Sequence, residues 1–153
     1  MSEATDAEVT VRSAEAGDAA VLSSLMTELG YTTRAAEMEM RLEVIRADSR
    51  YATLVAVVDG KIAGMIGIFF HYSYEHNGPS GRIIALVVTE KMRDRGVGTR
   101  LLAAAESILA ERNIRRVALN TRFEREEAHQ FYEKAGYKRN GFRFVKELAP
   151  TSD

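Results

Sequence analysis

The residues with the clearest chemical potential lie in the loop Arg93-Asp94-Arg95-Gly96-Val97-Gly98-Thr99. Gly96 and Gly98 lack a β-carbon, so a ligand can approach the backbone there and several N–H groups can converge on one point. The loop opens an amphipathic helix, whose unpaired N-terminal amides and dipole favour an anion. Two arginines add local positive charge. The segment therefore predicts a diphosphate site.

Two well-known phosphate loops do not fit this segment. A Walker loop needs Gly-Lys-Ser/Thr after a four-residue gap, and the sequence has none. The dinucleotide fingerprint needs a third small residue where this chain has Leu101, and it follows a first strand rather than a late one. The remaining alternative to a diphosphate site is a plain strand-to-helix turn whose arginines face solvent.

The spacing of apolar residues indicates the elements that position the loop. Alternating or continuous apolar runs predict six strands, at residues 8–12, 51–58, 62–70, 83–88, 116–120 and 142–148. Spacings of three and four predict four helices, at residues 19–29, 34–47, 97–109 and 125–135. A hairpin followed by strand-helix units predicts an α/β fold with a mixed sheet.

Three local features refine this assignment. Asp59-Gly60 predicts a tight hairpin between the second and third strands. Residues 71–81, which are polar and aromatic and contain Asn, Gly and Pro, predict a loop. Ile83–Val88 is apolar without interruption, which predicts a strand covered on both faces.

Composition narrows the classes of protein. A chain of 153 residues with 46% hydrophobic and 28% charged content predicts one globular domain. The absence of cysteine excludes disulfides, thiolate metal sites and a cysteine nucleophile. A net charge of -1 gives no global attraction to nucleic acid or an anionic membrane. No apolar run approaches the ~20 residues that span a bilayer, and Met1–Ala7 is polar, so we expect a cytoplasmic protein.

The spacing Arg93-x-x-Gly96-x-Gly98 after an apolar strand resembles the acetyl-coenzyme A loop of the GNAT family of N-acetyltransferases. A run similar to that family's second signature follows: Arg125-x-x-Ala128-His129-x-Phe131-Tyr132-x-x-x-Gly136-Tyr137. The resemblance implies a single N-acetyltransferase domain over residues 8–148, with polar tails at 1–7 and 149–153. It also implies a mostly antiparallel mixed sheet, flanked by about four helices and splayed between strands four and five.

The resemblance implies acetyl-coenzyme A as cosubstrate, bound at the splay and at the glycine loop. The residues that it assigns to this cosubstrate are Leu86, Val87, Val88, Arg93, Asp94, Arg95, Gly96, Val97, Gly98, Thr99, Asn120 and Arg125. The backbone of the first three would pair with pantetheine and polarise the thioester carbonyl. Asn120 could instead cap its own turn, and Arg125 stands where many relatives have asparagine.

Without a cysteine, direct attack of an amine on the thioester is the simplest route. The resemblance makes Tyr132 the general acid, because a phenol can protonate a departing thiolate. Many relatives carry a carboxylate in the fourth strand, where this chain has Ile84 and Ala85. The sequence leaves weak candidates for the base, with Glu75 as the named one: Glu28, Tyr31, His71, Tyr72, Tyr74, Glu75 and His76. His71 and His76 without a third ligand predict no metal site.

Three functions remain open. The acceptor is the primary amine of a small molecule, or it is a protein N-terminus or lysine, or the domain is a non-catalytic acyl-coenzyme A sensor that lacks the base. An acceptor site for polycations should show clustered carboxylates, and the cluster Glu124, Glu126 and Glu127 at a helix start is explained by the helix dipole. The resemblance also allows a homodimer through a sheet edge or the C-terminal strand.

Overall fold

The computed structural model describes residues 8–120 and 126–149. The chain divides into two compact units, Met1–Leu119 and Asn120–Asp153. The first unit contains all the strands and three of the helices found in the described residues, and the second contains one helix.

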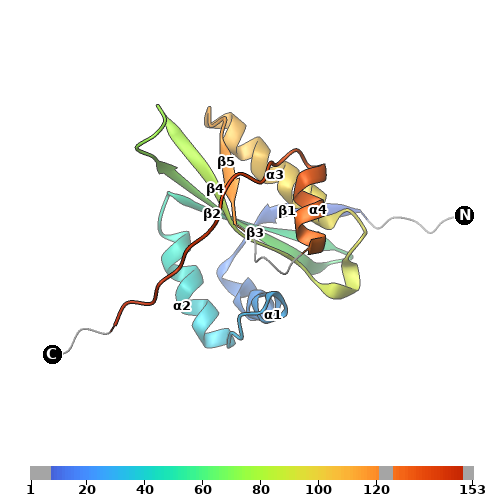
Figure 1. Cartoon of the computed structure of the whole chain (residues 1–153). Coiled ribbons are helices and arrows are strands. Elements are labelled where there is room, and N and C mark those ends of the chain that lie inside the picture. Colours follow the sequence, from blue (N-terminus) through green and yellow to red (C-terminus); the bar gives the residue numbers. More distant parts are fainter. Residues whose placement is uncertain (1–7, 121–125, 150–153) are drawn as a thin grey trace, which may run out of the picture. The chain divides into compact units, whose positions relative to one another are not determined.

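The first unit is built on a five-stranded sheet in the order β1-β2-β3-β4-β5 (Figure 1). Its elements in chain order are β1 (Val9–Ser13), the 3-10 turn η1 (Ala16–Asp18), α1 (Ala19–Leu29), α2 (Ala35–Arg46), β2 (Tyr51–Val58), β3 (Lys61–Tyr72), β4 (Pro79–Val88), the 3-10 turn η2 (Glu90–Met92), α3 (Val97–Glu111) and β5 (Val117–Leu119). Neighbouring strands are antiparallel except β4 and β5, which are parallel. The predicted mixed and mostly antiparallel sheet is confirmed.

Local sequence signals place most element ends correctly. Gly30 ends α1 in the left-handed conformation, as a C-terminal glycine does. Asp59 and Gly60 have φ angles of 51° and 77°, the pair of positive values that a type I′ hairpin turn requires. This turn sets the register of β2 on β3, and with it the position of β4.

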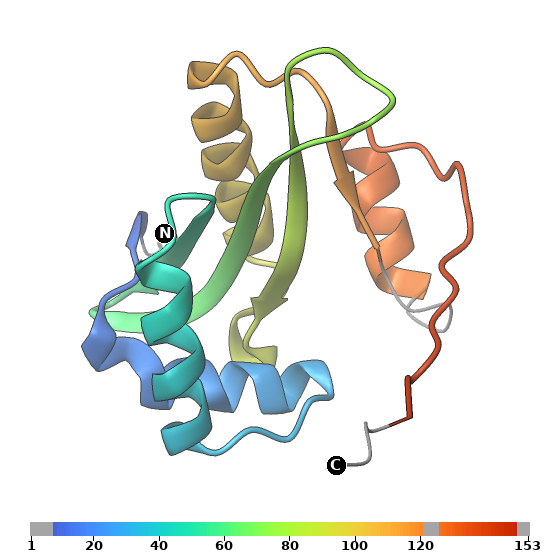
Figure 2. The same cartoon turned by 90° about the vertical axis from the view of Figure 1, so that its left-hand side faces the viewer.

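Helices cover both faces of the sheet (Figure 2). On one face α1 and α2 pack against sheet residues such as Val55, Met65 and Val87, which are all buried. On the other face α3 lies so close to the sheet that a β-carbon at Gly64 or Gly81 would touch its leucine side chains. Because helices pack against both faces, the sheet is rigid and its edge strands keep a fixed position.

The structure lengthens the strands predicted at 62–70 and 83–88, shortens the strand predicted at 116–120 to Val117–Leu119, and shortens the predicted loop at 71–81. β3 continues to Tyr72 and β4 begins at Pro79, which is tolerated because a first strand residue can lack an N–H donor. The prediction that Ile83–Val88 is covered on both faces is wrong, since the Ile84 side chain is 46% exposed.

The second unit contains α4 (Glu126–Lys134). The helix is followed shortly by Gly136, whose φ angle is positive at 98°. The predicted strand at 142–148 is wrong, because these residues form no strand. Its apolar side chains are exposed: Phe142, Phe144, Val145 and Leu148. Alternating apolar residues form a strand only where a partner strand accepts their backbone hydrogen bonds. Within the described ranges, no helix is long and apolar enough to cross a bilayer.

We expect Gly64→Ala to destabilise the protein by about 1–3 kcal/mol, because its β-carbon would lie 2.8 Å from the Val87 carbonyl oxygen. Gly67→Ala, three residues along the same strand, is the matched control, since its nearest neighbour is an Ile84 side-chain atom at 3.4 Å. Urea unfolding midpoints measure both. Equal midpoints for the two variants would contradict the close approach of β3 and β4 at Gly64.

Candidate functional site

β4 carries a bulge near its middle. Gly67 pairs with Ala85 while the next residue, Ile68, pairs with Ile83, so Ile84 is an extra residue on β4. A bulge bends its strand and often ends pairing on one side, and bulges are frequent beside active sites. Ile84 lies within the uninterrupted apolar run Ile83–Val88, so the sequence carried no signal for the bulge.

Pairing between β4 and β5 ends where the bulge begins. Gly81, Arg82 and Ile83 pair with Val117–Leu119, and the ladder goes no further within the described residues. On its other side β4 stays paired with β3 as far as Val88. The segment from Ile84 to Val88 therefore presents an open backbone edge on the side of β5, which we call the open edge.

The direction of the backbone groups along the open edge follows from one hydrogen bond. The Thr89 N–H donates to the Ala63 carbonyl at 2.8 Å, so Thr89 faces β3. Because successive residues alternate sides, Val87 also faces β3, whereas Leu86 and Val88 face the open edge. Leu86 and Val88 can thus bond an extended ligand. The Val87 backbone groups, which are also predicted to bind the ligand, point toward β3 instead.

The N-terminus of α3 offers free backbone donors. Gly96, its N-cap, has a φ of 79°, and no side chain caps the helix. The first helical bond runs from the Arg100 N–H to the Gly96 carbonyl at 3.0 Å, so the amides of Val97, Gly98 and Thr99 have no acceptor within the helix. A β-carbon at Gly96 would meet nothing within 4 Å. This terminus is suited to an anion.

Positive charge lies beside these amides. The loop residues Lys91, Arg93 and Arg95 are exposed, and none of them forms an ion pair with a described carboxylate. The Arg93 Nε donates to the Val88 carbonyl at 3.2 Å, which joins the loop to the end of the open edge. Asp94 is exposed and adopts a φ of 64°. The open edge and the glycine loop, which are the two parts of the predicted binding region, are thus joined by this hydrogen bond.

A carboxylate from α1 holds the same end of β4. Glu28 accepts the Thr89 hydroxyl at 2.9 Å through Oε2 and the Glu90 N–H at 2.9 Å through Oε1. Both donors lie between the open edge and the glycine loop. Of the candidate bases, Glu28 is therefore a carboxylate that the fold brings to this site.

The structure does not bring Glu75 to the open edge. Glu75 lies in the exposed hairpin loop before Pro79, and the seven strand residues from there to Leu86 span ~23 Å. The other hairpin candidates, His71, Tyr72, Tyr74 and His76, lie at or beyond the same strand ends. A polar cavity of about 300 Å³ is at this end as well, lined partly by His76, Arg115 and Arg116. This cavity lies at the opposite end of β4 from the open edge, so it is not part of the predicted acetyl-transfer site.

A second cavity of about 140 Å³ reaches the open edge, and sequence reasoning missed it. Ile84 and Ala85 form part of its lining, together with residues of β2, β3 and the two helices α1 and α2. The available signal was a pair of small residues, Gly67 and Ala85, which pair across β3 and β4 and leave space above the sheet.

The remaining predicted residues lie in or near the second unit. Tyr132 is half-buried in α4, where its ring meets those of Phe131 at 5.3 Å and Tyr137 at 6.1 Å. Asn120 directly follows β5 and is exposed. Arg125 lies outside the described residues. Their roles stay predictions.

Comparisons with known proteins agree with this geometry. Residues 20–137 match a family model described as the acetyltransferase (GNAT) family. The aminoalkylphosphonate N-acetyltransferase of Salmonella typhimurium is 36% identical over 94 residues, and the match spans 61% of this chain and 61% of that protein. Sequence features that resemble the same enzyme lie at residues 59–68, in the His-containing stretch that follows, in the run 125–132 and in the ending 142–148.

Solved structures show the same fold. A GNAT family acetyltransferase from Staphylococcus aureus is 29% identical with a TM-score of 0.78, over 92% of this chain and 98% of that one. A protein from Bacillus halodurans described as a transcriptional regulator is 22% identical with a TM-score of 0.86, over 92% of this chain and all of that one. The second likeness concerns the fold alone, since one fold can carry several functions.

We expect Glu28→Ala to loosen the segment that follows β4, because the Thr89 hydroxyl and the Glu90 N–H both lose their acceptor. Hydrogen exchange should become up to about tenfold faster at Glu90, as the loss of ~1 kcal/mol per hydrogen bond implies. Glu28→Gln, which keeps an acceptor oxygen, should show a smaller change, and Glu39→Ala on the exposed side of α2 is the control. An unchanged exchange rate at Glu90 in Glu28→Ala would show that the Glu28 hydrogen bonds do not stabilise this segment.

Proposed function

Because this chain belongs to the GNAT family of acetyltransferases, we propose that it transfers an acetyl group from acetyl-coenzyme A to the primary amine of a small molecule. The observation that carries the proposal is the open edge from Ile84 to Val88, which runs directly into the basic N-terminus of α3. An extended arm with amides and a diphosphate at its end matches both features.

The residues present fit such a cosubstrate. The Leu86 and Val88 backbone groups would pair with the pantetheine amides in place of a neighbouring strand. The Val88 carbonyl can accept a ligand N–H beside its bond to Arg93, since a carbonyl oxygen has two lone pairs. The amides of Val97–Thr99, with the positive charge of Arg93 and Arg95, would hold the diphosphate.

Acetyl-coenzyme A, when bound, supplies an acetyl group activated as a thioester. The Leu86 N–H would donate to the carbonyl oxygen and stabilise the negative charge that develops there. In the overall transfer a nitrogen–carbon bond forms and the carbon–sulfur bond breaks. Tyr132 would give its proton to the departing sulfur.

The amine must lose a proton before it attacks, and the choice of acceptor for that proton follows from position. Glu75 is far from the open edge, and Ala85 occupies the strand position where many relatives have a carboxylate. Proton removal is assigned to Glu28 or to water at the end of β4.

A small acceptor is favoured over a peptide because the cavity that reaches the open edge holds about 140 Å³. The name of the Salmonella relative makes aminoalkylphosphonates an acceptor class to test. The second candidate function is an acyl-coenzyme A sensor without catalysis, and Ala85 is the observation that favours it. A thiol-release assay with a panel of amines separates the two, since a sensor would bind acetyl-coenzyme A and release no thiol.

We expect the double variant Arg93→Glu/Arg95→Glu to bind acetyl-coenzyme A at least about tenfold more weakly, because it replaces two charge-assisted contacts with repulsion. The control is Arg115→Glu/Arg116→Glu, with the same change in net charge at the other end of β4. Titration calorimetry measures both affinities. Equal weakening in the two variants would mean that net charge, and not the glycine loop, governs binding.

We expect Tyr132→Phe to lower kcat by about 10²-fold or more while the affinity for acetyl-coenzyme A stays within about twofold, because only proton transfer to sulfur is lost. Tyr137→Phe, which removes a hydroxyl from a neighbouring ring, should keep its kcat. Steady-state kinetics and calorimetry give the two numbers. A wild-type kcat in Tyr132→Phe would remove this residue from the mechanism.

A further inference from the structure

The polar cavity of about 300 Å³ at the far end of β4 lies outside the proposed acetyl-transfer site, and we call it the distal cavity. It lies between the hairpin loop that joins β3 to β4 and the segment that joins α3 to β5, which meet at one end of the sheet (Figure 2). Its polar side chains are those of His76, Asn77, Ser80, Asn113, Arg115 and Arg116. All of its lining residues belong to the first unit, so the cavity is formed without the second.

Ser80 provides a hydroxyl that the protein itself does not use. The residue is only 6% exposed, yet its hydroxyl bonds to no described residue, and its oxygen is not fully enclosed by protein atoms. The next residue, Gly81, faces α3, since a β-carbon there would touch Leu109, so the Ser80 side chain points to the opposite face of β4. Ser80 lines the cavity on that face. Buried hydroxyls normally have a hydrogen-bond partner, so this one favours a ligand that enters the cavity.

Arg116 lies beside Ser80 at the start of the β4–β5 pair. The parallel register pairs Gly81 with Val117, so the preceding residues Ser80 and Arg116 are neighbours on the same face of the sheet. The Gly81 N–H donates to the Arg116 carbonyl at 3.0 Å, so the backbone groups of Arg116 are directed toward β4. The Arg116 N–H itself donates to no described residue. A hydroxyl and an amide are thus two adjacent donors at this end of the sheet.

Positive charge surrounds these two donors. Arg115 and Arg116 both line the cavity, and neither forms an ion pair with a described carboxylate. His76 is a third basic residue of the lining, which contains no aspartate or glutamate. A metal cation would find no carboxylate here, whereas guanidinium groups suit a carboxylate or a phosphate. The lining therefore favours an anion.

The two loops around the cavity are held in place without a ligand. In the hairpin, the His76 N–H donates to the Ser73 hydroxyl at 3.2 Å. In the segment before β5, the Ile114 N–H donates to the Leu109 carbonyl at 2.9 Å, and the Ile114 side chain is buried. The cavity is therefore largely preformed, which lowers the entropy cost of binding.

We propose that the distal cavity is a second anion site, separate from the glycine loop, and that its ligand is a small phosphate monoester with a hydroxylated body. The phosphate would accept the Ser80 hydroxyl and the Arg116 N–H, and the charges of Arg115 and Arg116 would stabilise it. The body would lie against the Asn77 and Asn113 amides, which can both donate to hydroxyl groups and accept from them. This assignment does not depend on the proposed acetyl transfer.

Charge and size both argue for this class. A phosphate monoester carries up to two negative charges and three terminal oxygens, enough for the Ser80 hydroxyl, the Arg116 amide and a guanidinium at once, whereas a carboxylate has two oxygens. A volume of about 300 Å³ equals that of roughly ten water molecules at ~30 Å³ each, which is more than a phosphate group fills. The remaining space is polar, so it suits hydroxyl groups rather than an apolar body.

The test is an NMR titration of the ¹⁵N-labelled full chain carrying Arg93→Glu and Arg95→Glu, so that the glycine loop no longer attracts anions. Ribose 5-phosphate should shift the Ser80, Gly81 and Arg116 amide signals and should bind at least about tenfold more tightly than ribose, as one charge-assisted hydrogen bond implies. Inorganic phosphate should bind about threefold more weakly than the ester, because it does not reach the asparagine amides. Absence of these shifts, or equal affinity for ribose, overturns the anion site. Equal affinity for inorganic phosphate overturns the ester as its ligand.

Single substitutions connect the binding to the cavity. Ser80→Ala removes a hydroxyl without breaking a hydrogen bond to a described residue, so its thermal midpoint should stay within about 2 °C of the wild type while ribose 5-phosphate binds about tenfold more weakly. Arg116→Gln should weaken binding to a similar extent. Lys61→Gln, with the same loss of charge at the opposite end of β3, is the matched control and should keep the wild-type affinity. A wild-type affinity in Ser80→Ala, or equal weakening in Lys61→Gln, overturns the inference.

Hydrogen exchange gives an independent measurement of where the ligand binds. A ligand that joins Ser80 to Arg116 spans the Gly81 N–H bond to the Arg116 carbonyl, the first bond between β4 and the segment that leads into β5. At a ribose 5-phosphate concentration of about ten times Kd, exchange of the Gly81 N–H should slow by up to about tenfold. The Phe70 N–H, which donates to the Arg50 carbonyl at 2.7 Å on the side of β2, is the control. An unchanged ratio of the Gly81 and Phe70 exchange rates overturns the assignment of Ser80 and Arg116 as the phosphate ligands.

Discussion

The site depends on one constraint: among the described residues, the backbone of β4 past its bulge has a neighbouring strand on one side only. The Val88 carbonyl at the open edge accepts the Arg93 Nε, whereas the Val88 N–H and both Leu86 backbone groups face the open edge, where water or a ligand must satisfy them. Covering them without partners would cost roughly 1–3 kcal/mol for each group. The extended ligand with amides that we propose would pair with these groups in place of a strand and so avoid this cost.

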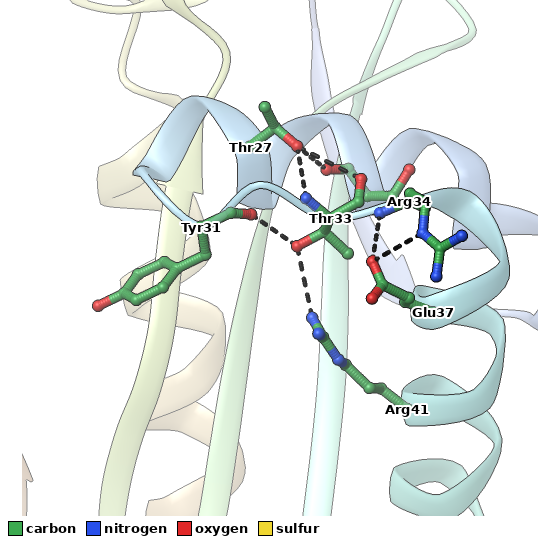
Figure 3. A network of polar contacts seen from close by, with 7 residues as sticks. Thr27, Tyr31, Thr33, Arg34, Glu37 and Arg41 are labelled. Carbon is green, nitrogen blue, oxygen red and sulfur yellow. Dashed lines mark hydrogen bonds and ion pairs between the residues drawn. The ribbon is translucent and has the colours of Figure 1, made fainter. Parts of the chain in front are cut away.

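The end of α1 and the loop after it organise both sides of that edge. Glu28 holds the segment between β4 and the glycine loop, where we propose that the cosubstrate binds. A few residues later Thr33, buried and bonded to Thr27, accepts a hydrogen bond from Arg41 of α2 (Figure 3). Since one short stretch of chain makes both contacts, a shift of α1 would change them together.

Ala85 changes the chemistry of the cavity that reaches the open edge. A carboxylate at this position would serve as a base and would also place negative charge in the cavity. With alanine there, the lining is apolar and its one charge is the positive Arg41. With Ala85 in β4, the described lining of this cavity therefore offers no carboxylate that could act as a base.

The sequence alone determined the features that depend on near neighbours: the helix opened at Gly96, the Asp59-Gly60 hairpin, the end of α1 at Gly30 and the family. Turn and cap conformations are set by a few adjacent residues, so their signals are local. Only the tertiary structure decided the bulge at Ile84, the distance of Glu75 from the open edge, the cavity under α2 and the absence of a strand at 142–148. Each of these depends on which distant segment pairs or packs against the residue, and the periodicity of a single chain segment carries no information about that partner.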